Sequence, residues 1–187
     1  MNIKQIFYTL AISALLLQPR AFAANEEATF ADIPWLSSKA SVKKIAEEKK
    51  YVFRSDEGIG IAYESVVSGW PAQIIFYFSP EDKLVKSLVN IITGEDRFMK
   101  IYEDNKNSLT KKYGNPTLSI RDFKPPYTDG DGKEAQAVKA GKATIFTAWK
   151  KLGLLLQIKG DSTVSISYES PYWEKELERI KAKATNK

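Results

Sequence analysis

Residues 72–84 read Ala-Gln-Ile-Ile-Phe-Tyr-Phe-Ser-Pro-Glu-Asp-Lys-Leu. In the first seven, Ala, Ile, Phe and Phe at the even-numbered positions alternate with Gln, Ile and Tyr, which is the two-residue period of a β-strand. The next five residues favour turns and are too few to hold a crossover helix. A run rich in Val, Ile and Leu follows at 84–93. The stretch therefore predicts two neighbouring antiparallel strands.

The same signals recur along the rest of the chain. Further strand-like runs lie at 59–63, 117–123, 143–149, 154–158 and 163–168, and helical periodicity marks 38–50, 95–113 and 172–184. We therefore expect a single α+β domain over residues 38–187, preceded by a lead-in segment at 24–37. It should be a meandering antiparallel sheet with helices packed on one face. Lys-Lys-Tyr closes both of the first two helices, at 49–51 and 111–113, which leaves open a duplicated helix-plus-three-strand unit.

The first 23 residues have the pattern of a secretory signal peptide. Lys4 supplies a positive charge, residues 6–17 form an uncharged and mostly apolar run, and Ala21-Phe22-Ala23 is a cleavage signal. The apolar run of about 12 residues is shorter than the roughly 20 that a membrane-spanning helix needs. The chain has no Cys, so it has no lipidation site. We expect a bacterial protein that is cleaved and then periplasmic or secreted.

The composition restricts the possible chemistry. The chain has no His and no Cys, which excludes imidazole bases, thiolate nucleophiles and the usual zinc sites. A net charge of +5 over 187 residues is mild and does not call for a nucleic-acid partner. We expect no cofactor and favour a protein that is not an enzyme. A small carboxylate-based hydrolase of the envelope remains an alternative, because 23 acidic residues allow many pairs.

One segment partly matches a calcium-binding loop. Asp129, Asp131 and Gly132 stand at positions 3, 5 and 6 of such a loop. Position 1 would be Tyr127 and position 12 Val138, and neither supplies a carboxylate. Asp129 and Asp131 are therefore weak metal candidates, and we predict a solvated turn without a high-affinity calcium site.

Aromatic residues outside the periodic runs are candidates for partner binding. Trp70 lies between Gly69 and Pro71 in a predicted turn, and Trp35 follows a proline before the first helix. Tyr127 lies in the long connection at 124–142. Because exposed aromatic side chains are frequent hot spots of interfaces, we take these three as binding candidates. Trp70 is expected to matter more for binding than for folding.

The sequence Lys-Tyr-Gly-Asn-Pro at 112–116 ends the second helix and leads into strands that carry Trp149. With the export signal and the order of elements, it resembles small periplasmic α+β modules over about residues 95–170. Among these are the BamE/SmpA-type envelope proteins and the β-lactamase-inhibitor-type folds. The resemblance implies protein binding rather than catalysis. Envelope members of the first group are lipoproteins, whereas this chain has no lipidation Cys.

The expected function is therefore that of an exported, non-enzymatic protein. It would bind another macromolecule, a protein or an envelope component, through the sheet face or its loops. Besides the hydrolase, an inhibitor of a lytic enzyme is a further alternative. It ranks lower because lysozymes are commonly basic and a positively charged inhibitor lacks the complementary charge.

Overall fold

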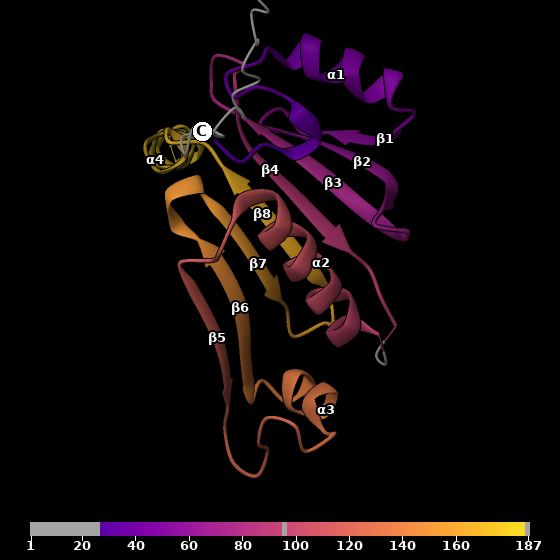
Figure 1. Ribbon diagram of the computed structural model, residues 1–187. Helices are drawn as coiled ribbons and strands as arrows, with labels where there is room; N and C mark the ends of the chain where they lie inside the picture. Colours follow the sequence, from indigo (N-terminus) through magenta and orange to yellow (C-terminus); the bar gives the residue numbers. More distant parts are fainter. Residues whose placement is uncertain (1–26, 95–96, 186–187) are drawn as a thin grey trace, which may run out of the picture.

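A computed structural model describes residues 27–94 and 97–185. These residues form one α+β domain with an eight-stranded antiparallel sheet (Figure 1), which confirms the predicted fold class. The proposed signal peptide lies outside the described residues. The elements are η1 (Phe30–Asp32), α1 (Lys39–Glu48), β1 (Val52–Asp56), β2 (Gly60–Val67), β3 (Trp70–Phe78), β4 (Leu84–Ile91), α2 (Phe98–Tyr113), β5 (Leu118–Phe123), α3 (Glu134–Lys139), β6 (Ala143–Trp149), η2 (Lys150–Leu152), β7 (Leu154–Ile158), β8 (Val164–Glu169) and α4 (Trp173–Thr185).

The sheet order β1-β2-β3-β4-β8-β7-β6-β5 divides the domain into two similar halves. Each half is a helix followed by a four-stranded meander, with α3 inserted after β5 in the second half. The last strands of the two halves, β4 and β8, pair antiparallel at the centre. The duplicated unit therefore has four strands rather than the three that we expected, because β1 was not recognised in the sequence.

Helices α1 and α2 pack on the same face of the sheet (Figure 1). The N-cap of helix α1 is Ser38, whose Oγ accepts a hydrogen bond from the Ser41 amide at 3.2 Å. Helix α2 buries Phe98, Tyr102 and Leu109 on one side, and its C-cap, Gly114, has a positive φ.

The core consists of two clusters that share three half-buried side chains. One lies beneath α1 and includes Phe76 and Phe78, and the other lies beneath α2 and combines residues from both halves of the sheet. Phe30, Trp35 and Val67 pack against both clusters. The lead-in segment is therefore part of the core rather than an appendage.

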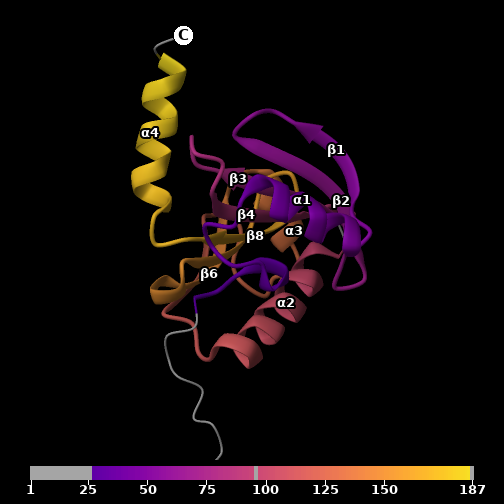
Figure 2. The ribbon, with the colours of Figure 1, turned by 90° about the horizontal axis from the view of Figure 1, so that it is seen from above.

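Helix α4 differs from the expectation that the helices share one face. In Figure 2 it rises on the side of the sheet opposite to α2. Its first residue, Trp173, packs on Tyr77 of β3, with ring centroids 6.0 Å apart. The side chain of Tyr77 alternates with the buried Phe76 and Phe78 and so points away from α1. Helix α4 therefore meets the face of the sheet opposite to α1.

Candidate functional site

The face of the sheet opposite to α1 and α2, called the open face below, is the main candidate site. Strand register places one side chain from each of seven strands in a continuous row across it. The members of this central row are Ala62, Ile75, Leu88, Ser167, Leu155, Ala148 and Leu118. Six of the seven are apolar. Ile75, Leu88, Leu155 and Leu118 are half-buried, so part of each side chain is accessible.

A mainly polar row runs beside the central row on the open face. Gln73, Asn90, Ser165 and Gln157 stand opposite one another on successive strands, and Phe146 and Ile120 complete the row toward β5. Asn90 Nδ2 donates to Gln73 Oε1 at 3.4 Å, and Ser165 Oγ donates to Asn90 Oδ1 at 3.1 Å. Lys159 Nζ also donates to Asn90 Oδ1 at 3.0 Å. These mutual hydrogen bonds hold the amide side chains in place.

Charged and aromatic side chains border the other side of the central row. Lys86 Nζ forms an ion pair with Glu169 Oε1 at 2.6 Å, and Ser167 Oγ donates to the same oxygen at 3.1 Å. Lys86 Nζ also lies 4.6 Å from the centroid of the Trp173 ring. Because Trp173 begins α4, this contact fixes the base of α4 at the end of the open face.

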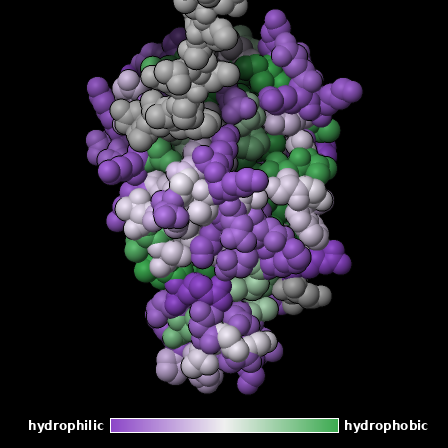
Figure 3. All heavy atoms as spheres, in the orientation of Figure 1, coloured by the Kyte–Doolittle hydropathy of each residue, from purple (hydrophilic) through white to green (hydrophobic). Residues whose placement is uncertain are grey.

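The central row departs from the usual pattern of a sheet with one solvated face. In such sheets the outward positions are polar, whereas here they form an apolar line between two polar borders. On the other side of the molecule, which Figure 3 shows, the surface over α2 is mainly hydrophilic. An apolar centre with a polar rim is the usual anatomy of a protein interface. The arrangement is therefore suited to binding a macromolecule.

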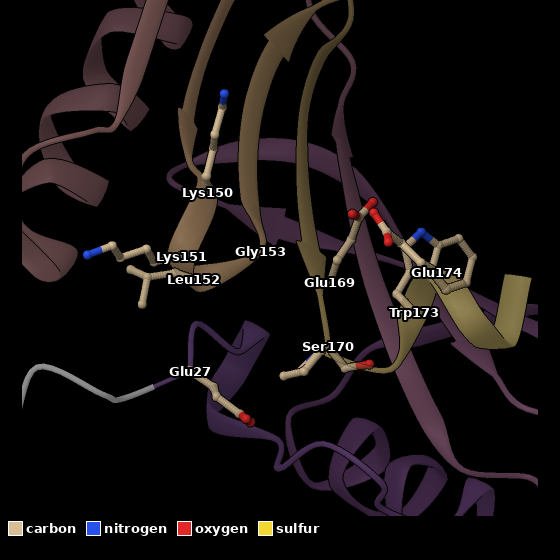
Figure 4. A pocket seen from close by; sticks show the side chains of 10 residues that line it. Glu27, Lys150, Lys151, Leu152, Gly153, Glu169, Ser170, Trp173 and Glu174 are labelled. Carbon is tan, nitrogen blue, oxygen red and sulfur yellow. The ribbon is translucent and has the colours of Figure 1, made fainter.

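A small pocket lies near the base of α4 (Figure 4). It is lined by parts of η2, the end of β8, the start of α4 and Glu27 of the lead-in. Its volume of ≈ 280 Å³ is just below the range of about 300–1,000 Å³ that is typical of small-molecule sites. In Figure 4 the charged ends of Lys150, Lys151 and Glu27 lie well apart, whereas the carboxylates of Glu169 and Glu174 lie near one another. Glu169 is already ion-paired with Lys86. The pocket therefore carries no assignment of a reaction.

Trp70 lies on the helix-covered side of the sheet. It is the first residue of β3, follows a turn at Ser68-Gly69, and pairs with Val67. Its half-buried ring packs against the larger core cluster, and the Arg97 guanidinium carbon lies 5.4 Å from the ring centroid. Trp70 is therefore separated from the open face by the sheet. Its role in binding remains a prediction.

Trp35 is half-buried between the two core clusters. Its indole Nε1 is buried and has no hydrogen-bond partner among the described residues. Trp35 therefore joins the lead-in segment to both clusters. Contact with a partner through Trp35 stays a prediction.

Tyr127, Asp129 and Asp131 lie in the connection between β5 and α3. Arg121 Nε donates to Asp129 Oδ2 at 2.9 Å, and this hydrogen bond lowers the pKa of Asp129. Asp131 accepts hydrogen bonds from the Thr128 and Lys133 amides, which lower its pKa. Both carboxylates are thus engaged within the protein. In the described ranges, no group of three or more acidic residues is placed to hold a metal ion.

Sequence reasoning did not single out the residues of the open face. The sequence does indicate in part that the open face is unusual, because β3 is apolar at nearly every position rather than at alternate ones. A strand that is apolar on both sides indicates that both faces of the sheet are covered by protein, by its own helices or by a partner. Only the register across β8 and β7 shows that the outward positions join into one row.

The fold and the site together define a two-layer α+β protein with one sheet face free of α1 and α2. No family model, curated protein or solved structure matches the chain. The likeness to the periplasmic modules therefore stays a sequence-based expectation. Among the helices of the described residues, none is long and apolar enough to cross a membrane.

Proposed function

We propose that this chain is an exported, non-enzymatic protein that binds another protein through the open face of its sheet. The observation that carries the proposal is the central row, in which half-buried apolar side chains from separate strands form one line. Contiguous apolar side chains that stay partly accessible on a monomer are candidates for an interaction site. The partner surface should be apolar at its centre, with polar groups that meet the two borders.

The polar borders favour a specific partner over unspecific adhesion. The side chains of Asn90 and Glu169 are held by several hydrogen bonds, so they lose little conformational freedom when a partner docks. Export remains part of the proposal and rests on the pattern of residues 1–23. N-terminal sequencing of the exported protein tests it and should find Ala24 or Asn25 as the first residue.

The binding test is a capture experiment with matched variants. Leu155→Lys places a charge in the middle of the central row, whereas Ile59→Lys adds the same charge at an exposed turn, where Ile59 is 45% exposed. A partner captured from a periplasmic extract by the wild type and by Ile59→Lys, but not by Leu155→Lys, supports the proposal.

Calorimetry with the purified partner then measures how much binding free energy each variant loses. Leu155→Lys should weaken binding by at least about 2 kcal/mol, the threshold for an interface hot spot. Circular dichroism must show that both variants are folded. If folded Leu155→Lys binds the partner as tightly as the wild type, the open face is not the binding surface.

A further inference from the structure

The two edges of the sheet, β1 and β5, are the first strands of the two halves and so occupy equivalent positions. They differ in how they are protected against pairing. In β1 the register shifts between Phe53 and Ser55, so Arg54 forms a bulge there, and Arg54 is ion-paired with Glu64. Bulges and charges are the usual means by which edge strands avoid other strands. Strand β5 keeps a continuous register with β6 from Leu118 to Phe123.

The backbone of β5 presents three residues outward. Lys124 N donates to Lys142 O at 2.8 Å, which identifies the even-numbered residues of β5 as those that bond to β6, because such pairs alternate along a ladder. The N–H and C=O groups of Ser119, Arg121 and Phe123 therefore point away from the sheet. In the described part of the chain no strand lies outside β5 (Figure 1).

Strand β5 carries two charged side chains, of which Arg121 is turned inward and Asp122 is exposed. The guanidinium of Arg121 donates to Asp129 and to Glu103 of α2, and only 26% of the side chain is exposed. Arg121 therefore does not extend beyond the edge, where its charge would hinder pairing with another strand. The outward backbone of β5 is regular, and it borders the apolar end of the open face at Leu118 and Ile120.

We infer that β5 pairs with β5 of a second copy of this chain, in an antiparallel arrangement centred on Ile120. A two-fold axis through Ile120 and perpendicular to the sheet joins the two sheets into one and keeps both open faces on the same side. Ser119 of each copy then faces Arg121 of the other, and such a pair exchanges two backbone hydrogen bonds. The inference is independent of the proposed function.

The side chains of β5 permit pairing with a second copy and favour this register. Centred on Ile120, the pairing places Ile120 opposite itself and Leu118 opposite Asp122, so no like charges meet. Centres at Arg121 or Asp122 would place each charge opposite itself, which is destabilising. In this register Phe123 faces Thr117, whose amide already donates to Ala148 O at 2.8 Å, so the two Ser119–Arg121 pairs are the complete ones. A centre at Ser119 would leave only one complete pair, that of Ser119 with itself.

A single cysteine tests the arrangement directly, because the chain has no Cys of its own. Ile120 would form a non-hydrogen-bonded pair with itself, with Cα atoms about 4.5 Å apart. That spacing lies within the range of about 4.4–6.8 Å that a disulfide spans. Under mild oxidation Ile120→Cys should convert to a covalent dimer on a non-reducing gel. Asp122→Cys, on the same face two residues along, should remain monomeric.

A second pair of variants tests the role of the backbone. Ser119→Pro removes an outward N–H and leaves the bonds to β6 intact, whereas Ser119→Ala keeps the N–H. An interface through one strand is small, so the dimer should be concentration-dependent. In sedimentation equilibrium the mass of the wild type and of Ser119→Ala should rise toward that of the dimer with concentration, and that of Ser119→Pro should not.

The cross-linking experiment with Ile120→Cys tests the inference even if Ser119→Pro does not fold. If Ile120→Cys forms no covalent dimer, or forms it no faster than Asp122→Cys, pairing through β5 is overturned. Leu155→Lys, which lies away from this edge, should leave the dimer unchanged. The result is therefore distinguishable from failure of the open face to bind a partner.

Discussion

Gly153 shows how one residue determines the approach of two strands. It follows η2 and has a φ of 60°, in the left-handed region that residues with a side chain rarely adopt. A Cβ atom at this position would lie 2.1 Å from the carbonyl oxygen of Glu169. The Glu169 amide also donates to Gly153 O at 2.8 Å, so the two backbones are held together. Glycine is therefore required where β7 begins beside β8.

We predict that Gly153→Ala is markedly more destabilising than Gly69→Ala. Gly69 has a φ of 81°, but an added Cβ would meet no heavy atom within 4 Å. Its replacement should cost only the left-handed conformation, about 1–2 kcal/mol. At Gly153 the clash with backbone should add about 1–3 kcal/mol or more, as in overpacked sites. Urea unfolding of both variants measures the difference. Equal midpoints would contradict the close approach.

At the scale of an element, the β2–β3 hairpin illustrates how position changes the role of a side chain. The sequence places Trp70 in a turn, where it would be exposed. In the structure the turn is Ser68-Gly69, both with positive φ, and Trp70 begins the strand. The side chain of Ser68 donates to Asn105 of α2 at 3.2 Å, so the hairpin end rests on that helix. Trp70 consequently packs beneath α2.

This placement predicts a measurable effect of Trp70→Ala on folding. Substitution of an exposed residue typically costs under about 1 kcal/mol of unfolding free energy, and truncation of a buried Trp costs about 3–5 kcal/mol. The cost of Trp70→Ala should lie between these two values. Trp149→Ala is the matched control, because Trp149 is 2% exposed and its Nε1 donates to Gly114 O at 2.7 Å. The urea midpoints of Trp70→Ala and Trp149→Ala show which variant is less stable. If Trp70→Ala leaves the midpoint unchanged but weakens partner binding, the first expectation for Trp70 is right.

At the scale of the whole molecule, the two halves should unfold as one unit. The larger core cluster contains residues from β3 and β4 of the first half as well as from β6, β7 and β8. Trp35 packs against both clusters and so couples them. We therefore predict a single urea transition for the wild type, with coincident curves from far-UV and near-UV circular dichroism.

Trp35→Ala should lower the midpoint of this transition without splitting it, because the β4–β8 pairing still joins the halves. Two separate transitions in the wild type would show that the helix-plus-four-strand units fold independently. Phe53→Ala provides the control, since Phe53 is 54% exposed and lies on the edge strand β1. That variant should change the midpoint only slightly.

Local chemistry made much of the fold predictable from the sequence. The alternation in residues 72–78 and the turn at 79–83 correspond to the observed β3 and the β3–β4 turn. Strand β1 was missed because its side chains are mostly exposed and its register is broken by a bulge, so it has no alternation. Helix α3 was missed because it has only six residues within a long connection.

The sequence by itself determined the absence of His and Cys chemistry, the α+β class and most of the strands and helices, since these depend on neighbouring residues. Only the tertiary structure decided which side of the sheet is covered, that β4 pairs with β8, and that β5 lies at an edge. Alternation divides a strand into two sides but does not say which side meets a helix. The row from Ile75 to Leu118 exists only through long-range register, which packing of the whole chain selects.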